Sequence, residues 1–402
     1  MRHIQLRIIH WFLLFCLITL FGLAACGDEE NTNSQADNSD TTATLTSQTV
    51  KRGDWKRTEL TAEHSLEAIK QAGSVLGPDV PVTSLQYAVK LHRLVYTTTD
   101  GNGQLINASA ALALPVKNPQ LASPLLSFQH GTLFYNAEAP GNDTSAASPH
   151  ALLASLGYIV IAADYVGYGI SQGTPHPYLQ KTASANAVTD LIQASRYWLE
   201  QQTVPLNQQL FLTGYSQGGH VTMAAHQALE QSGNHDVTAS IPAAGPYNLV
   251  ATLDKLTSEY RFRQQKKILM ANSVMQPAQR LSPVVADALA DFVIDQVIPT
   301  DTDIVFSNKV IYDYLRTDGE ATTQENVYDW KALAPVRLHH GKDDQVVPFK
   351  NATDALAAMQ ARGSTDTTLI ECLATPKADH DNCIAPYGLL VTEYFGGIAQ
   401  GL

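Results

Sequence analysis

Short apolar runs alternate with amphipathic stretches along most of the chain. Residues 158–163 form a continuous run rich in β-branched residues, which is typical of a strand covered on both faces. Residues 124–128 form a short apolar run, and residues 210–213 predict another buried strand. Between residues 163 and 210, apolar residues recur at helical spacing from residue 188 to residue 199. Because strands and helices alternate in this way, the sequence predicts an α/β fold with a mostly parallel sheet and helices on both sides.

Further strands and a hairpin extend this pattern. Residues 87–96 and 106–114 are rich in strand-forming residues, and the Asp-Gly and Asn-Gly steps between them predict a hairpin turn. A second amphipathic helix is indicated at residues 221–229. The remaining predicted strands are short and lie at residues 237–241, 336–339 and 368–370.

One long segment, residues 246–334, breaks the alternation because it is mainly helical in pattern and offers no obvious sheet strand. Ser282 and Pro283 suit the start of a helix. An apolar stripe follows them, made of Val285, Leu289, Phe292, Val293 and Val297. Since an insertion of this length is uncommon as a bare loop, we expect a helical cap over the sheet edge. It acts either as a lid over a substrate pocket or as a helical bulge that only stabilises the core.

The composition is that of a globular protein. The chain has 402 residues, of which 45% are hydrophobic and 16% are charged, so disorder throughout is excluded. A formal net charge of −12 argues against a nucleic-acid partner, which would need a basic face. The chain has four cysteines and no CxxC pair, which excludes a disulfide scaffold and a thiolate zinc site of the usual spacing.

The first 25 residues have the order of an export signal. Arg2 and Arg7 precede an apolar run at residues 8–23, and small residues then lead to Cys26. The segment Leu-Ala-Ala-Cys at residues 23–26 resembles the bacterial lipobox, which implies cleavage before Cys26 and attachment of lipid, palmitate included, to that residue. A plain signal peptide and an uncleaved membrane anchor are the alternatives.

After Cys26 the chain is polar and acidic as far as residue 50. This stretch contains no aromatic residue, Lys or Arg, so it cannot bury enough apolar area to order its backbone. We therefore expect a lipoprotein signal peptide at residues 1–25, a disordered acidic tether at residues 26–54 and a folded domain at residues 55–402. Resemblance to bacterial lipoproteins implies attachment to the cell envelope. Gly27, where Asp would signal retention, favours the outer membrane over the inner one if there are two.

The sharpest motif is Gly214-Tyr215-Ser216-Gln217-Gly218, which matches G-x-S-x-G between a predicted strand and a predicted helix. In that context Ser216 is expected in a strained turn with its hydroxyl raised above the sheet, as a nucleophile. Gly214 and Gly218 are expected there because a side chain would collide with the adjoining strand and helix. The alternative is a serine in a purely structural turn.

A serine hydroxyl needs a base to become a nucleophile, and the base needs an orienting acid. In folds with this elbow the partners follow in the order serine, acid, histidine. His380 is the only histidine after residue 340 and is therefore the predicted base. For the acid, the pattern G-x-x-D-x-x-V-P at residues 341–348 selects Asp344 over its neighbour Asp343. Weaker rivals are Asp354, Asp366, Glu371 and Asp379.

Two backbone N–H groups are expected to form an oxyanion hole. One belongs to Gln217, the residue after the nucleophile. The other belongs to Thr132, or alternatively Gly131, in a His-Gly-Thr segment after the first parallel strand. The candidates for lining the substrate pocket, each with packing as the alternative, are Tyr165, Tyr215 and His130.

Cys372 and Cys383 lie on either side of His380. In an exported protein such a close pair suggests a disulfide, which would hold the histidine loop in place. Two reduced cysteines in a core are the alternative. No metal site is predicted. The histidines considered as ligands are His220, His226, His339 and His340, and no defined ligand spacing or partner carboxylate accompanies them.

With these motifs the chain resembles the α/β-hydrolase superfamily, and within it the secretory lipase and esterase group. The resemblance covers about residues 85–400 and rests on residues 128–132, 164–169, 214–219 and 340–348. It implies a serine hydrolase of carboxylic esters with a helical cap and with no metal or organic cofactor. The chain departs from the group at Asp379-His380, where the family often has Gly-His.

Three functions are compatible with these residues. The first is hydrolysis of a small-molecule ester or a lipid through an acyl-enzyme, with membrane attachment only through the lipid anchor. The second is a serine peptidase like prolyl oligopeptidase, although the sequence has no propeller repeats. The third is a non-catalytic surface-binding module on a hydrolase scaffold, although such modules typically lose the serine or the histidine.

Overall fold

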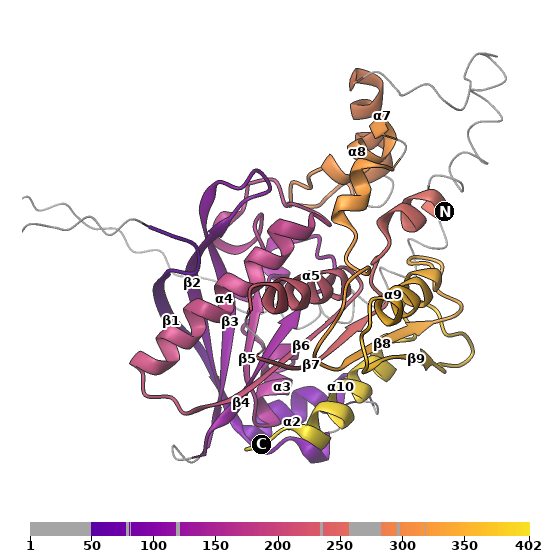
Figure 1. The fold of residues 1–402 in the computed structure, drawn as a ribbon. Coiled ribbons are helices and arrows are strands. Elements are labelled where there is room, and N and C mark those ends of the chain that lie inside the picture. Colours follow the sequence, from indigo (N-terminus) through magenta and orange to yellow (C-terminus); the bar gives the residue numbers. More distant parts are fainter. Residues whose placement is uncertain are drawn as a thin grey trace, which may run out of the picture. The chain divides into compact units, whose positions relative to one another are not determined.

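A nine-stranded sheet runs through the described part of the chain (Figure 1). The computed structural model describes residues 50–77, 80, 82–117, 121–233, 236–256, 283–295, 298–317 and 319–402. The strand order in the sheet is β1-β2-β3-β5-β4-β6-β7-β8-β9. The strands are β1 (Trp55–His64), β2 (Ala88–Thr99), β3 (Leu105–Val116), β4 (Ser123–Gln129), β5 (Ile159–Ala163), β6 (Leu206–Tyr215), β7 (Val237–Ala243), β8 (Val336–Gly341) and β9 (Thr367–Cys372).

Most of this sheet is parallel. Strands β5, β4, β6, β7, β8 and β9 pair in parallel, whereas β1, β2 and β3 pair with one another in antiparallel. Strand β3 also pairs antiparallel with β5 and so joins the two parts. The predicted α/β fold and the predicted β2-β3 hairpin are confirmed. The continuous apolar runs arise because parallel strands are buried on both faces.

Helices cover both faces of the sheet. Alternate residues of β5 face opposite sides of the sheet. Ile159 and Ile161 pack in one core with α4, while Val160 packs in the opposite core with α3 and α10. Helices α5 and α9 share a further core over strand β8. The helices are α2 (Leu66–Val75), α3 (Pro149–Ser155), α4 (Lys181–Gln201), α5 (Gln217–Gln231), α7 (Pro283–Asp295), α8 (Lys309–Thr317), α9 (Lys350–Ala361) and α10 (Ile384–Ile398).

The structure extends the predicted fold at both ends. Strand β1 and helices α2, α9 and α10 were not singled out in the sequence. None of the side chains of β1 is fully buried, so its hydrophobic pattern is weak. Helix α10 contains three glycines and buries only Tyr387, Val391 and Phe395. Both elements therefore lack the strong periodicity on which the prediction relied.

The folded domain begins before the predicted boundary at residue 55. The backbone N–H of Gly53 donates to the carbonyl of Thr97 over 2.8 Å, and Arg52 pairs with Asp190 at 3.0 Å. Asp190 is a buried carboxylate on α4 and needs such donors, which is the physical reason why residues 52–54 join the domain rather than the tether. The signal peptide and the tether up to residue 49 lie outside the described residues. None of the helices in the described ranges is long and apolar enough to cross a membrane.

The described part of the insertion contains helices, as expected, together with irregular segments, but the buried face of α7 differs from the predicted stripe. Leu289 and Phe292 of the predicted stripe are 37% and 38% exposed. The buried face of α7 consists of Ala286, Ala290, Val293 and Ile294, which follow the helical spacing i, i+4, i+7, i+8. Of these, Ala290, Val293 and Ile294 pack against α8 and against Leu179 and Leu249. Val297 and most of residues 246–282 of the predicted cap, from residue 257 on, lie outside the described residues.

Candidate active site

Strand β6 and helix α5 meet in a sharp turn at Ser216. Its φ of 59° and ψ of −121° lie in a region that L-residues rarely adopt, so the turn is strained. The N–H of Ser216 donates to the carbonyl of Ala243 on β7 over 2.9 Å and ties the turn to the neighbouring strand. A Cβ on Gly214 would collide with the carbonyl of Gly218, and a Cβ on Gly218 would collide with the carbonyl of Gln129. Glycine is therefore required at both positions, as the motif predicted.

Three side chains that are far apart in sequence form a hydrogen-bonded chain above this turn. The hydroxyl of Ser216 lies 2.9 Å from Nε2 of His380, and Nδ1 of His380 lies 2.7 Å from Oδ2 of Asp344. Because the carboxylate can only accept, Nδ1 carries the proton and Nε2 is left to accept the serine hydroxyl. The structure thus brings together the three residues that the sequence predicted as nucleophile, base and acid.

The carboxylate of Asp344 is buried and accepts four hydrogen bonds. Oδ1 accepts the backbone N–H groups of Val346 and Val347, each over 2.8 Å. Oδ2 accepts from His380 and also from Nε2 of His340, which lies 3.1 Å away. Burial alone would raise the pKa of Asp344, but the bonds from the two histidines outweigh it and hold the pKa well below its ordinary value. This acid therefore remains ionised.

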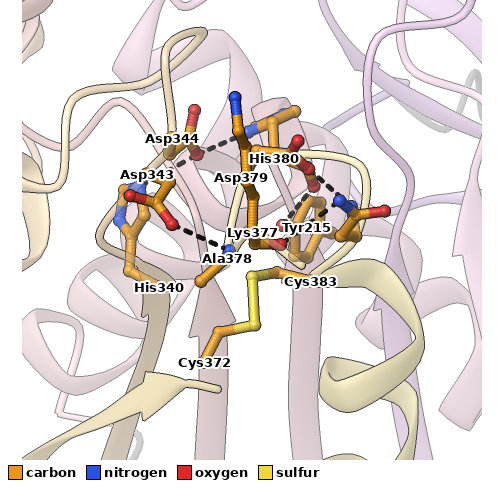
Figure 2. Close-up of a disulfide and its surroundings, with 11 residues drawn as sticks. Tyr215, His340, Asp343, Asp344, Cys372, Lys377, Ala378, Asp379, His380 and Cys383 are labelled. Carbon is orange, nitrogen blue, oxygen red and sulfur yellow. Dashed lines mark hydrogen bonds and ion pairs between the residues drawn. A yellow bond between two sulfur atoms is a disulfide. The ribbon is translucent and has the colours of Figure 1, made fainter. Parts of the chain in front are cut away.

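Asp343, the alternative acid, has another role. Its carboxylate accepts the N–H of Ala378 over 3.0 Å, and its own N–H donates to the carbonyl of Ala378 over 3.1 Å (Figure 2). It thereby clamps the loop that carries His380. The other rival carboxylates bond elsewhere, namely Asp354 to Asn248 and Lys350, Asp366 to Arg337, Glu371 to Lys342, and Asp379 to the N–H of Asn382.

The loop of His380 is closed by a disulfide. Cys372 at the end of β9 is bonded to Cys383 just before α10, as expected for a close pair of cysteines in an exported protein (Figure 2). The hydroxyl of Tyr215 donates to the carbonyl of His380 over 2.7 Å, which links the loop to the elbow. The loop is therefore held by a covalent bond, by the Asp343 clamp and by Tyr215.

The two expected oxyanion donors come from segments on either side of Ser216. Gln217 is the first residue of α5, where a backbone N–H has no acceptor within the helix. Gly131 lies beside the nucleophile, because a Cβ placed on it would be 3.8 Å from the Cβ of Ser216. The next residue, Thr132, bonds through its hydroxyl to the hydroxyl of Tyr178 at 3.1 Å.

The three candidate pocket residues are buried scaffold residues. Tyr165 is 3% exposed, and its hydroxyl donates to the carbonyl of His130 over 3.2 Å. The ring of His130 stacks on the ring of Tyr165 at 4.0 Å, and burial lowers the pKa of His130 to about 4. Tyr215 is 9% exposed, and its hydroxyl donates a hydrogen bond to the His380 loop. These contacts favour the packing role for all three.

His176 is a site residue that the sequence did not reveal. Its Nδ1 lies 2.8 Å from the carbonyl of Val166, and its Nε2 lies 2.8 Å from the side-chain nitrogen of Gln217. A carbonyl only accepts, so Nδ1 carries the proton and Nε2 accepts from Gln217. Burial lowers the pKa of His176 to about 3, which keeps the ring neutral. No motif surrounds this histidine, so only the folded chain identifies it.

Comparison with known proteins is consistent with this geometry. A protein-family profile described as "Serine aminopeptidase, S33" matches residues 147–372. A ligand-bound form of the rice cell wall degrading esterase LipA from Xanthomonas oryzae is 25% identical, with a TM-score of 0.61 over 85% of this chain and 98% of that one. A putative hydrolase from Legionella pneumophila is 23% identical, with a TM-score of 0.67 over 85% and 97%.

A more distant solved structure has the same fold. Candida antarctica lipase A is 16% identical, with a TM-score of 0.53 over 83% of this chain and 78% of that one. No curated protein gives a significant sequence match. In the described ranges no three His, Cys, Asp or Glu side chains gather as metal ligands would.

The disulfide generates a first prediction. We expect the double replacement Cys372→Ser and Cys383→Ser to lower the free energy of unfolding by about 3 kcal/mol, because the open loop gains entropy in the unfolded chain. Guanidinium unfolding followed by circular dichroism measures this change. Wild-type protein with and without dithiothreitol is the matched comparison, and an unchanged midpoint in both experiments would contradict the prediction.

Proposed function

The chain belongs to the serine aminopeptidase S33 family of α/β-hydrolases, and on that premise we propose that it is a serine hydrolase that cleaves carboxylic esters. The observation that carries the proposal is the hydrogen-bonded chain from Ser216 through His380 to Asp344. A serine hydroxyl whose proton already faces a neutral imidazole nitrogen is prepared for nucleophilic attack. A serine in a merely structural turn would not need this partner.

The reaction follows from these positions. His380 Nε2 takes the proton of Ser216 while Oγ bonds to the ester carbonyl carbon, and the carbonyl electron pair moves onto the oxygen. The N–H groups of Gln217 and Thr132 are the proposed donors to that oxyanion, each worth about 3 kcal/mol of barrier. The imidazolium then returns its proton to the departing alkoxide as the carbon–oxygen bond to the alcohol breaks. Water repeats the sequence and releases the acid from Ser216.

Asp344 supports both proton transfers without taking a proton itself. It holds the tautomer of His380 in which Nε2 is free, and its negative charge stabilises the imidazolium. The bonds that lower the pKa of Asp344 keep that charge in place. If the pKa of this acid were about 7, the carboxylate would take a proton from the imidazolium and lose its negative charge.

An ester is a better-supported substrate than a peptide. Tyr178 touches the oxyanion segment through Thr132, and its ring lies 5.5 Å from the ring of Phe306 in the insertion. Phe134 extends this aromatic group, at 6.4 Å from Phe306. Apolar ring faces suit an acyl or aromatic part of a substrate. Solved structures of the same fold are named as esterases and a lipase, whereas the family description names an aminopeptidase, so peptide hydrolysis is the second candidate.

We further propose that the enzyme is exported and anchored to the bacterial cell envelope by lipid on Cys26. The support is the order of basic residues, apolar run and Leu-Ala-Ala-Cys at residues 1–26. The acidic segment that follows would then act as a tether between the membrane surface and the folded domain.

Replacement of single triad residues tests the catalytic proposal. We expect Ser216→Ala to reduce hydrolysis of p-nitrophenyl butyrate at least about 10³-fold, because the nucleophile is lost while its surroundings remain. Asp344→Asn is expected to reduce kcat by about 10⁴-fold, because an amide favours the wrong tautomer of His380.

The neighbouring replacement Asp343→Asn is the matched control and should retain most of the activity, because Asn keeps an oxygen for the Ala378 N–H. Thermal unfolding of each variant shows whether it is folded. Full turnover by folded Ser216→Ala, or equal losses in the two Asp variants, would refute the assignment.

A substrate panel separates the two hydrolase candidates. We expect measurable kcat/KM for p-nitrophenyl esters of several chain lengths. Turnover of aminoacyl p-nitroanilides, including prolyl p-nitroanilide, should not exceed the background rate of the Ser216→Ala variant. The physical reason is that amide hydrolysis also requires recognition of the peptide amine. Anilide turnover comparable to ester turnover would favour the peptidase.

The lipid anchor has its own test. We expect Cys26→Ala to abolish incorporation of labelled palmitate and to move the protein from the membrane fraction to the soluble fraction of the cell envelope. Ester hydrolysis per folded molecule should stay the same, because residue 26 precedes the folded domain. Membrane association of Cys26→Ala without palmitate would instead support an uncleaved anchor helix.

A further inference from the structure

A second histidine contacts the acid of the proposed triad. His340 stands on β8, four residues before Asp344, and its side chain is 0% exposed. Its Nε2 lies 3.1 Å from Oδ2 of Asp344 and 3.0 Å from the carbonyl of Val347. His380 approaches the same Oδ2 from the disulfide-closed loop at 2.7 Å (Figure 2). One carboxylate oxygen is therefore shared by two imidazole rings from different segments.

The hydrogen-bond partners of His340 show which ring nitrogen carries the proton. A carboxylate and a carbonyl only accept hydrogen bonds, so Nε2 must carry the proton. Nδ1 is buried and has no hydrogen-bond partner among the described residues. A side chain selected only to fill this space would avoid such an unpaired nitrogen, because a buried polar atom without a partner is unfavourable. Leucine would fill the space without that disadvantage. The hydrogen bond that Nε2–H donates therefore explains why a histidine stands at position 340.

That N–H restrains the part of Asp344 that the backbone leaves free. The N–H groups of Val346 and Val347 both bind Oδ1 and locate that oxygen. Rotation of the carboxylate about Oδ1 would still move Oδ2, the atom that orients His380. His340 binds Oδ2 itself and prevents this rotation.

We propose that His340 is a positioning residue, which holds Oδ2 of Asp344 in line with Nδ1 of His380. The inference rests on the proposed function, since it concerns the same triad. His340 touches neither the nucleophile nor the expected substrate position, and it acts only through Asp344. Besides the two histidines, Tyr215 and Asp381 carry titratable groups whose charges interact with that of Asp344. Neither of them donates a hydrogen bond to Oδ2, so in the described part of the chain only His340 shares that oxygen with His380.

The decisive experiment compares three variants. His340→Leu removes the N–H and keeps an apolar side chain of similar size, while His340→Gln keeps an N–H at a similar reach. His339→Leu is the matched control, because His339 is the buried neighbour on β8 whose side chain points to the opposite face of the sheet. Steady-state kinetics with p-nitrophenyl butyrate, the pH profile of kcat/KM and the thermal midpoint are measured for each.

We expect His340→Leu to lose about 10- to 100-fold in kcat with little change in KM, because a bond to a charged group is lost and no substrate contact changes. His340→Gln should recover most of the activity. His339→Leu should change the thermal midpoint but keep kcat within about threefold.

Different outcomes point to different failures. If wild type hydrolyses the ester and Ser216→Ala does not, but folded His340→Leu equals wild type in kcat and pH profile, the positioning role is wrong and the triad stands. If wild type and Ser216→Ala are equal, the proposed function itself is wrong. If His340→Leu does not fold, His340→Asn replaces it, since its amide is too short to reach Oδ2. Equal activity of the Asn and Gln variants would then overturn the inference.

Discussion

Parallel strands bring all their carboxyl ends to one edge of the sheet, and the whole site depends on that constraint. Strand β6 delivers Ser216 to this edge, β8 delivers the segment with Asp344, and β9 leads into the loop with His380. The register between neighbouring parallel strands sets the distances between these segments within the sheet. The loops that follow the strands then determine the final positions of the site side chains.

Those loops are unequal in how firmly the backbone holds them. The elbow is set by steric exclusion, since Gly214 and Gly218 allow main-chain atoms to approach where no side chain fits. The acid segment is set by hydrogen bonds to Asp344. The His380 loop belongs to no strand, and it is the one with a covalent closure, a clamp from Asp343 and a bond from Tyr215. The restraints are most numerous where the sheet itself gives the least support.

The sequence was most informative where chemistry requires one residue type at one spacing. The elbow, the acid motif and a single late histidine led to Ser216, Asp344 and His380 because nucleophile, acid and base admit few alternatives. Edge strand β1 and the buried face of α7 were missed or shifted, because half-exposed elements carry a weak or ambiguous pattern. His176 contacts Gln217 from a distant segment, so no local pattern indicates that contact. His340 lies only four residues before Asp344, but the sequence pattern does not show that its ring turns toward Oδ2.

His176 also shows how the insertion reaches the elbow. Its backbone pairs with the insertion, donating to the carbonyl of Val305 over 2.7 Å and accepting from Ser307 over 2.9 Å. Its ring accepts a hydrogen bond from Gln217, whose own N–H is the proposed oxyanion donor. The neutral ring can make this bond only in one tautomer, which the carbonyl of Val166 selects. A displacement of residues 305–307 would therefore disturb the ring that binds the side chain of Gln217. This imidazole joins the insertion to the oxyanion side of the site, alongside the contact of Phe306 with Tyr178 and of Tyr178 with Thr132.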